Sequence, residues 1–356
     1  MTPTVPVILD VDTGIDDSLA LLYAVASPEA DILAVTCVSG NVEARQVATN
    51  TLAVLELAGR TDVDVAIGRA VPLVRPLETT PETHGPHGIG YAELPPPTRR
   101  LSERHGVDLI VDEARRRPRE VTLVTLGPLT NLAAALEQEP ALPSLLRGFV
   151  LMGGAFGVPG NTTPTTEWNL HCDPEAARIV FRSWGAATEA DPAIPRPLAL
   201  GLDVTEQVRI LPNHVVELAR RAGSTPDDDL AVESQRDPLG PRRSVAGNPV
   251  IRFIADALRF YFEFHERYDG FYGAFIHDPF AVAATLDRRL VTSEALYVDV
   301  ETSGELTTGM TVADRRRLTG RSPNLDVATG ADVDTFLDRL IERVGDLAAT
   351  RAGART

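Results

Sequence analysis

The chain begins with an apolar run that leads directly into acidic side chains, Val5-Pro6-Val7-Ile8-Leu9-Asp10-Val11-Asp12-Thr13-Gly14-Ile15-Asp16-Asp17. The apolar part predicts a buried β-strand over residues 5–11. Clustered carboxylates at the end of a buried strand are costly unless a cation lies among them. A hard ion that prefers oxygen ligands, such as Ca²⁺ or Mg²⁺, meets that need. The stretch therefore predicts a metal-dependent site at the carboxyl end of a strand.

Apolar strand-like runs alternate with helical patterns along the rest of the chain. Further strands are predicted over residues 32–38, 63–67, 121–126, 149–152 and 198–202, and helices over 18–26, 42–58, 107–116, 129–137, 174–183 and 249–267. Residues 292–328 are typical of β-structure with turns, and an apolar stripe over 333–344 predicts a last helix. The alternation predicts an α/β fold with one domain over residues 1–356, in which helices flank a mostly parallel, Rossmann-like sheet. In such sheets ligands bind at the carboxyl edge of the strands.

The composition of the 356-residue chain, with 44% hydrophobic and 24% charged residues, is ordinary for a globular protein. The net charge of −16 argues against a nucleic-acid partner, because nucleic-acid-binding surfaces are basic. The sequence has no lysine, which excludes a Walker lysine, a Schiff-base lysine and a lysine general base. No run is apolar enough for a membrane span, and the first strand leaves no room for a signal peptide. Cys37 and Cys172 lie in no CxxC pattern. We therefore expect a cytoplasmic protein with no membrane partner.

Two long polar stretches interrupt the α/β pattern. Residues 68–97 are rich in Pro and Gly and carry His84 and His87. A loop of this length in a compact domain is usually functional or disordered. Residues 223–248 are charged and broken by proline, and we expect a mobile insertion there.

Asp16 and Asp17 open the helix predicted over residues 18–26. Aspartate is favoured in a first turn simply because it caps free amides and opposes the helix dipole. Either residue alone has that ordinary explanation. Together with Asp10 and Asp12, they exceed what the start of one helix needs.

Two further polar groups have both a structural and a functional interpretation. Asn161, Glu167 and Asn169 lie on a proline-containing loop, which is either merely solvated or suited to hydroxyl recognition. Trp168 is either a stacking platform or part of the core. His277-Asp278-Pro279 precedes an apolar helical run, where Asp278 can be an ordinary N-cap and His277 a structural histidine. A histidine beside a candidate metal ligand is also a plausible proton donor.

Several blocks of the sequence, in order, resemble the inosine–uridine-type nucleoside hydrolases. They are Asp10-x-Asp12-Thr13-Gly14-x-Asp16-Asp17, Val38-Ser39-Gly40-Asn41, Leu126-Gly127-Pro128-Leu129-Thr130-Asn131, Met152-Gly153-Gly154, Glu167-Trp168-Asn169, Gly201-Leu202-Asp203-Val204-Thr205 and His277-Asp278-Pro279. Thr13 stands where the family commonly has proline. The resemblance extends from about residue 5 to residue 345 and implies a Ca²⁺-dependent hydrolase that cleaves ribonucleosides into ribose and free base.

The resemblance also assigns roles to residues of this chain. It implies that one Ca²⁺ is held by Asp12, Asp17, Asp278 and the backbone carbonyl of Leu126. Asp12 would also take a proton from the attacking water, and His277 would protonate the leaving base. Asp10 would be a supporting carboxylate next to the metal ligands, without binding the ion itself. The residues expected to hold the ribose are Asp16, Asn41, Met152, Asn161, Glu167, Asn169 and Asp278. A homodimer or homotetramer is also implied.

The chemistry of N-glycosidic cleavage agrees with these roles. Positive charge builds on the ribose in the transition state, as in other glycoside hydrolysis, and surrounding carboxylates stabilise it. A bound Ca²⁺ positions a water molecule and lowers its pKa. The base is a poor leaving group unless an acid protonates it. Buried groups that bind both ribose hydroxyls would reject 2′-deoxy substrates.

The base preference stays open at the level of sequence. By resemblance, His277 favours a broad inosine–uridine or a pyrimidine-leaning profile. His84-Gly85-Pro86-His87-Gly88 fits the pattern of the family loop that closes over the base. The candidates for contacts with the base are therefore His84, His87, Trp168, Phe271 and Tyr272.

Three other functions compete with this interpretation. A haloacid-dehalogenase-type phosphatase also starts with a strand and Asp-x-Asp, but Gly14 stands where that family has Thr or Val. A non-catalytic nucleoside- or ribose-binding protein of the same fold would not need a general acid such as His277. A hydrolase of a modified or unusual ribonucleoside is compatible with every block.

Overall fold

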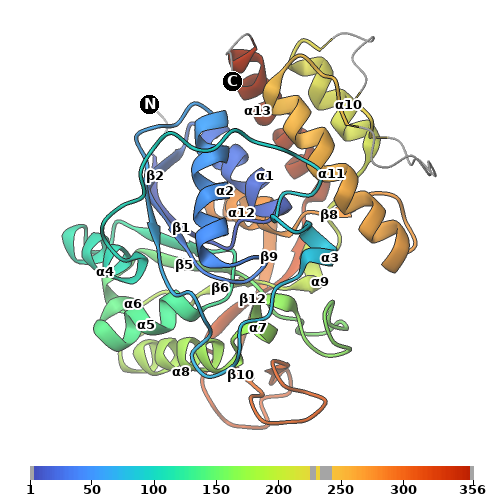
Figure 1. The fold of residues 1–356 in the computed structure, drawn as a ribbon. Helices are drawn as coiled ribbons and strands as arrows, with labels where there is room; N and C mark the ends of the chain where they lie inside the picture. The colour runs from blue at the N-terminus through green and yellow to red at the C-terminus, as the bar shows by residue number, and fades with distance from the viewer. Residues whose placement is uncertain (1–3, 225–229, 233–242, 353–356) are drawn as a thin grey trace.

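An eight-stranded sheet forms the centre of the computed structural model, which describes residues 4–224, 230–232 and 243–352 (Figure 1). In spatial order its strands are β3 (Asp64–Ile67), β2 (Ala30–Cys37), β1 (Val5–Val11), β4 (Thr122–Thr125), β5 (Gly148–Met152), β6 (Leu198–Leu200), β12 (Leu325–Ala331) and β9 (Val291–Leu296). Every neighbouring pair is parallel except β12 and β9. This arrangement confirms the predicted α/β fold with a mostly parallel sheet.

Helices cover both faces of the sheet (Figure 1). One layer contains α1 (Ile15–Ala26), α2 (Ala44–Leu57), α10 (Pro212–Arg221), α11 (Pro249–Tyr268), α12 (His277–Leu286) and α13 (Val333–Arg351), and the other contains α4 (Gly106–Arg116), α5 (Thr130–Gln138), α6 (Leu142–Leu145) and α8 (Pro174–Ala190). The short elements are α3 (Pro81–His84), α7 (Trp168–Cys172), α9 (Leu202–Thr205), η1 (Arg288–Leu290), β7 (Arg209–Ile210), β8 (Ala274–Phe275), β10 (Val298–Val300) and β11 (Thr311–Ala313). No described helix is long and apolar enough to span a membrane.

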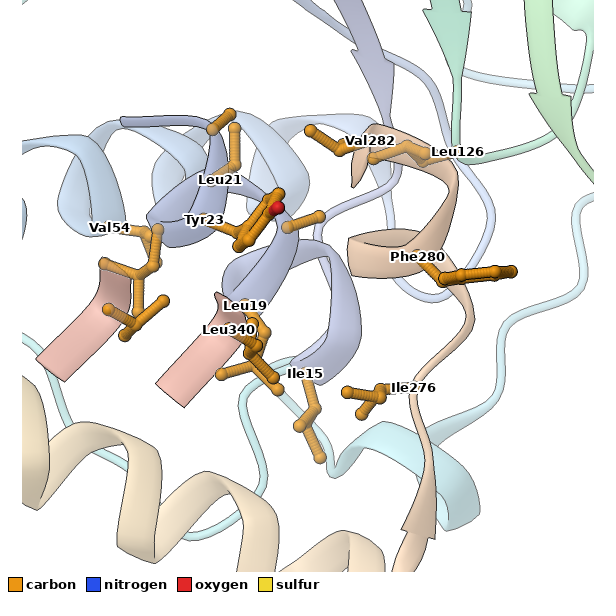
Figure 2. Packing of buried hydrophobic residues seen from close by; sticks show 14 of the residues in the cluster. Ile15, Leu19, Leu21, Tyr23, Val54, Leu126, Ile276, Phe280, Val282 and Leu340 are labelled. Atoms are coloured by element: carbon orange, nitrogen blue, oxygen red, sulfur yellow. The ribbon is translucent and has the colours of Figure 1, made fainter. Parts of the chain in front are cut away.

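The apolar core fixes α1 and α12, the two helices that carry acidic residues into one region. Figure 2 shows Ile15 and Leu19 of α1 near Ile276 and Phe280 of the α12 segment, with Leu340 of α13 alongside. All five side chains are buried, at 2% exposure or less. Because burial of each large apolar side chain contributes about 1.5–3 kcal/mol, this packing holds the starts of α1 and α12 firmly in place.

The strand order reverses beside β1. From β1 the chain moves outward through β2 and β3, then returns to β4 on the other side and continues through β5 and β6. At such a switch point the loops after the neighbouring strands diverge and leave a crevice at the carboxyl edge. Asp10 and Asp12 lie at this edge, at and directly after the end of β1.

The structure corrects several predicted boundaries. Helix α8 continues to Ala190 instead of ending at residue 183, because Trp184 is buried against Phe149 and makes the following turns part of the core. The stretch 68–97 contains the short helix α3, and α1 begins at Ile15 rather than at residue 18. Of the predicted insertion at 223–248, residues 225–229 and 233–242 lie outside the described residues.

Candidate active site

Asp10 is a buried support beneath the site. Its Oδ1 accepts hydrogen bonds from Thr36 Oγ1 on β2 (2.5 Å) and from Asn131 Nδ2 on α5 (2.7 Å). Burial raises the pKa of Asp10 to about 7, although both hydrogen bonds oppose the rise. Asp10 therefore ties β1 to β2 and α5, and it does not line the cavity described below.

Asp12 lies in a narrow slot between two glycines. Its Oδ2 accepts a hydrogen bond from the backbone N–H of Asn41 (2.8 Å), whereas its Oδ1 is buried without a hydrogen-bond partner among the described residues. A Cβ atom at Gly40 would overlap Oδ2, and one at Gly127 would come within 2.8 Å of Oδ1. Burial, together with the nearby charge of Asp17, raises the pKa of Asp12 well above its usual range.

Three carboxylates meet where α1 and α12 begin. One oxygen each from Asp16, Asp17 and Asp278 lies within 4.8 Å of the others, and all three residues are buried. Asp17 is oriented by the backbone N–H groups of Gly14 (2.8 Å) and Asp12 (3.2 Å). Such a convergence of buried acids is the donor set that a divalent metal ion requires.

The electrostatics of this trio support the same conclusion. Burial and the charge of Asp17 raise the pKa of Asp16 to about 8, and burial raises that of Asp17 to about 6. Burial and the neighbouring acids raise the pKa of Asp278 well above its usual range. Without a cation, burial and mutual repulsion disfavour the ionised forms of these groups, whereas a bound cation would stabilise them. The residues present therefore fit a hard metal ion.

The close trio contains two of the predicted metal ligands, Asp17 and Asp278. Its third member, Asp16, is a residue that the resemblance assigned to the ribose. The carbonyl oxygen of Leu126, also a predicted ligand, accepts a hydrogen bond from Asn169 Nδ2 (2.7 Å). This contact brings a predicted ribose-binding amide next to the acidic cluster.

Glu167 organises a second polar group after β5. It caps α7 by accepting from the backbone N–H groups of Asn169 (2.7 Å) and Leu170 (3.2 Å). The N–H of Gly154 also donates to it (2.9 Å), and Gly154 has a φ of 88°, a left-handed conformation that favours glycine. Burial raises the pKa of Glu167 to about 6. Asn161 lies on the exposed loop before α7, where its Oδ1 accepts from the N–H of Trp168 (3.0 Å).

Two buried histidines flank the acidic trio. The Nδ1 of His277 is 2.8 Å from the hydroxyl of Thr205, and the Nδ1 of His84 accepts from the N–H of Ile15 (3.1 Å). Burial, with a further contribution from His265, lowers the pKa of each to about 3. Both imidazoles are therefore neutral near pH 7 in the ligand-free site.

These groups surround a cavity of about 530 Å³, a volume suited to a small molecule. The predicted site residues that line it are Asp16, Asn41, His84, Leu126, Met152, Asn161, Glu167, Trp168, Asn169, His277 and Asp278. Asp12 and Asp17 are buried behind this lining. Among the candidates for contacts with the base, His87 is exposed, and neither it nor Phe271 nor Tyr272 lines the cavity.

Sequence reasoning missed the aromatic end of the cavity. It is lined by Tyr261, Phe264, His265 and Tyr268 of α11, together with Phe275, Glu206 and Asp269. The four α11 residues recur at helical spacing on one face. This spacing predicts that one face of the helix is buried. Because any helix that packs on a core has the same stripe, the spacing does not show that these residues line a cavity.

Comparison with known proteins identifies the family. The model of the inosine–uridine preferring nucleoside hydrolases matches residues 7–338. The chain is 39% identical over 341 residues to the pyrimidine-specific ribonucleoside hydrolase RihA of Escherichia coli K12, a match that covers 95% of this chain and 98% of the relative. RihA of Escherichia fergusonii is matched to the same extent.

Solved structures agree with the sequence comparison. A purine-preferring ribonucleoside hydrolase from Gardnerella vaginalis has a TM-score of 0.83 at 32% identity, covering 97% of this chain and 99% of its own. A plant nucleoside hydrolase, the PpNRh1 enzyme, has a TM-score of 0.81 at 30% identity, with coverages of 96% and 99%. The chain therefore belongs to the inosine–uridine preferring nucleoside hydrolase family and is a ribonucleoside hydrolase, as the sequence blocks indicated.

Proposed function

We propose that this protein is a Ca²⁺-dependent hydrolase that cleaves the N-glycosidic bond of ribonucleosides, pyrimidine ribonucleosides among them, to ribose and free base. The observation that carries the proposal is the arrangement of the cavity. Its lining combines buried carboxylates, amide side chains and an aromatic group that comes largely from α11. The inclusion of pyrimidine substrates rests on the 39% identity to pyrimidine-specific relatives.

The acidic end would hold the metal ion. Asp17 and Asp278 contribute carboxylates from the starts of α1 and α12, and Asp12 and the carbonyl of Leu126 are the remaining ligands implied by the family resemblance. When bound, Ca²⁺ would position a water molecule and make it more acidic. Asp12 suits the role of proton acceptor, because its Oδ1 has no protein partner among the described residues and its pKa is raised.

The middle of the cavity would hold the ribose. Asn41, Asn169 and Glu167 are each buried at 5% exposure or less, and both amides and the carboxyl line the cavity. Amides donate and accept, and carboxylates accept, so this set can satisfy vicinal hydroxyls. Asp16 and Asp278 lie at the same place and would stabilise the positive charge that builds on the sugar as the C1′–N bond breaks.

The aromatic end would hold the base. Planar rings pack favourably against aromatic side chains, and Phe275 lies beside His277 in the cavity lining, which also includes Tyr261. We assign His277 as the proton donor to the departing base, with Thr205 fixing its ring through Nδ1. The neutral ring of the ligand-free cavity must gain a proton before or during the reaction, and the charge of Asp269, which lines the same cavity, favours the protonated form.

A reducing-sugar assay with uridine, cytidine, inosine, adenosine and 2′-deoxyuridine tests the proposal. We expect ribose release from uridine and cytidine but little from the deoxynucleoside, because its binding leaves buried polar groups unpaired. Chelation with EGTA should stop the reaction and added Ca²⁺ should restore it. Binding of nucleosides without any turnover would instead establish the non-catalytic alternative, and turnover of only a modified ribonucleoside would redirect the substrate assignment.

A further inference from the structure

An exposed loop supplies part of the cavity wall. Residues 157–165, which precede α7, are exposed or half-buried, yet Gly160, Asn161 and Thr162 line the cavity. The Oδ1 atom of Asn161 accepts a hydrogen bond from the N–H of Trp168 (3.0 Å), which leaves the Nδ2 group of Asn161 as the donor for a ligand. A surface loop is mobile unless buried contacts hold it, so this amide needs an anchor to stay in one place.

Thr166 is the buried residue at the end of this loop. It has no exposed surface, and its Oγ1 donates a hydrogen bond to the carbonyl oxygen of Thr308 (2.8 Å). Its own carbonyl oxygen accepts from the N–H of Thr162 (3.3 Å), next to Asn161. The backbone at Gly160 packs directly on Thr166, because a Cβ atom there would lie 2.2 Å from the Thr166 nitrogen. Thr166 therefore joins the cavity loop to a segment 142 residues later in the chain.

The segment that receives this hydrogen bond is residues 301–310, the connection between β10 and β11. It is closed by hydrogen bonds between the backbones of Glu301 and Gly309 (2.7 Å) and of Glu301 and Met310 (3.0 Å). It is also fastened from outside, since Arg75 donates to the carbonyl oxygen of Thr302 (2.7 Å). The carbonyl of Thr308 is thus part of a fixed structure.

Gly309 allows the connection to approach Thr166 closely. Its φ of 82° is left-handed, and a Cβ atom at this position would lie 2.5 Å from Cγ2 of Thr166. The adjacent Thr165 adds a second contact, from its Oγ1 to the carbonyl oxygen of Leu306 (3.1 Å). The two segments therefore fit each other at one defined place.

We propose that Thr166 is a positioning residue whose hydrogen bond to Thr308 holds the loop of Asn161 where its amide meets the ribose. The inference rests on the proposed function and on the assignment of Asn161 to the ribose. It concerns substrate binding and not the chemical step, because Thr166 does not line the cavity and acts only through the loop.

Thr166→Val tests this role, because valine keeps the shape of threonine and removes the hydroxyl donor. We expect KM for uridine to rise roughly 3- to 10-fold, the effect of losing one net hydrogen bond, while kcat changes by less than about 2-fold. p-Nitrophenyl riboside should show the same rise, since it shares the ribose but not the base. Thr166→Ser retains the donor and should restore most of the wild-type KM.

A double-mutant cycle with Asn161→Ala separates positioning from a loss of stability. If Thr166 acts through Asn161, Thr166→Val should raise KM by less than about 2-fold once the amide is absent. Partial unfolding would instead lower the amount of active enzyme, and with it the apparent kcat, and would leave KM unchanged.

Two further variants serve as a check and a control. Gly309→Ala should raise KM as Thr166→Val does, because its Cβ atom pushes the connection away from Thr166. Thr188→Val removes a similar hydrogen bond, from Oγ1 to the carbonyl oxygen of Trp184 (3.0 Å) on α8, and should leave KM at the wild-type value.

The outcomes distinguish this inference from the proposed function. A wild-type enzyme that releases no ribose from any ribonucleoside overturns the proposed function and this inference with it. An active wild type whose KM is unchanged by Thr166→Val overturns the inference alone. The same holds if the effects of Thr166→Val and Asn161→Ala on KM multiply in the double variant, or if Thr166→Ser is as impaired as Thr166→Val. Should Thr166→Val fail to fold, an unchanged KM in Gly309→Ala has the same meaning.

Discussion

The burial of Asp10 makes the stability of the metal-free protein depend on pH in a way that one substitution removes. Both donors to this residue, Thr36 and Asn131, bond to Oδ1, and Oδ2 has no partner among the described residues. Asp10→Asn keeps an oxygen for both donors and replaces only the unpartnered atom. The variant therefore imitates the protonated form of Asp10 at every pH.

The pKa of Asp10 gives the size and the direction of the effect. Burial raises it from 3.8 to about 7 in the folded protein, so the folded state retains a proton that the unfolded chain releases. The stabilising contribution is complete below pH 3.8 and falls as pH rises toward 7. At 1.36 kcal/mol for each unit of pKa, the loss is about 4 kcal/mol by pH 7–8, an upper limit because buried sites relax.

The measurement is urea unfolding of the wild type and Asp10→Asn in EGTA from pH 4.5 to 8. We expect the wild type to be less stable than the variant by about 1 kcal/mol at pH 4.5 and by up to about 4 kcal/mol at pH 8. Asp108→Asn, which alters an exposed carboxyl group on α4, is the control and should show no such trend. A difference between the wild type and Asp10→Asn that stays constant across this range would refute the reasoning.

Four further outcomes are expected. Asp12→Asn should lower kcat roughly 10²- to 10⁴-fold by removing the proton acceptor, and near-wild-type turnover would contradict that role. His277→Ala should slow inosine by a similar factor but p-nitrophenyl riboside only slightly, and equal losses would exclude an acid role. Gly40→Ala should lower activity and Ca²⁺ affinity because its Cβ overlaps the carboxylate of Asp12, whereas Gly247→Ala, whose Cβ meets nothing within 4 Å, should not. Added Ca²⁺ should raise the melting temperature, because an ion that binds only the folded state stabilises it, and no shift at millimolar Ca²⁺ would count against the metal site.

The sequence predicted the fold well because parallel α/β sheets have a strong local signature. Buried strands are short continuous apolar runs, and the run at residues 5–11 matches β1 at both ends. The errors lie where tertiary packing overrides local preference. The continuation of α8 past residue 183 depends on the contact between Trp184 and Phe149, two residues far apart in the sequence.

The site was predictable to the extent that its residues lie at the ends of strands or within family blocks. The acidic residues of β1 and α1 are adjacent in sequence, so their convergence follows from topology alone. The aromatic end has no such signal, because α11 presents Tyr261 and His265 to the cavity on the same stripe that packs on the core. Only the three-dimensional structure separates these two uses of one helix face.

The acidic and the aromatic residues of the site come from different segments of the chain. The acidic trio lies at the starts of α1 and α12, and most of the aromatic residues lie in the last turns of α11. Substitutions on α11 can therefore alter the base contacts without moving Asp17 or Asp278. Relatives named as purine-preferring and as pyrimidine-specific both match this chain over nearly its whole length. Because both kinds of relative match nearly the whole chain, we expect the difference in their base preferences to lie in side chains that line the cavity outside the acidic trio.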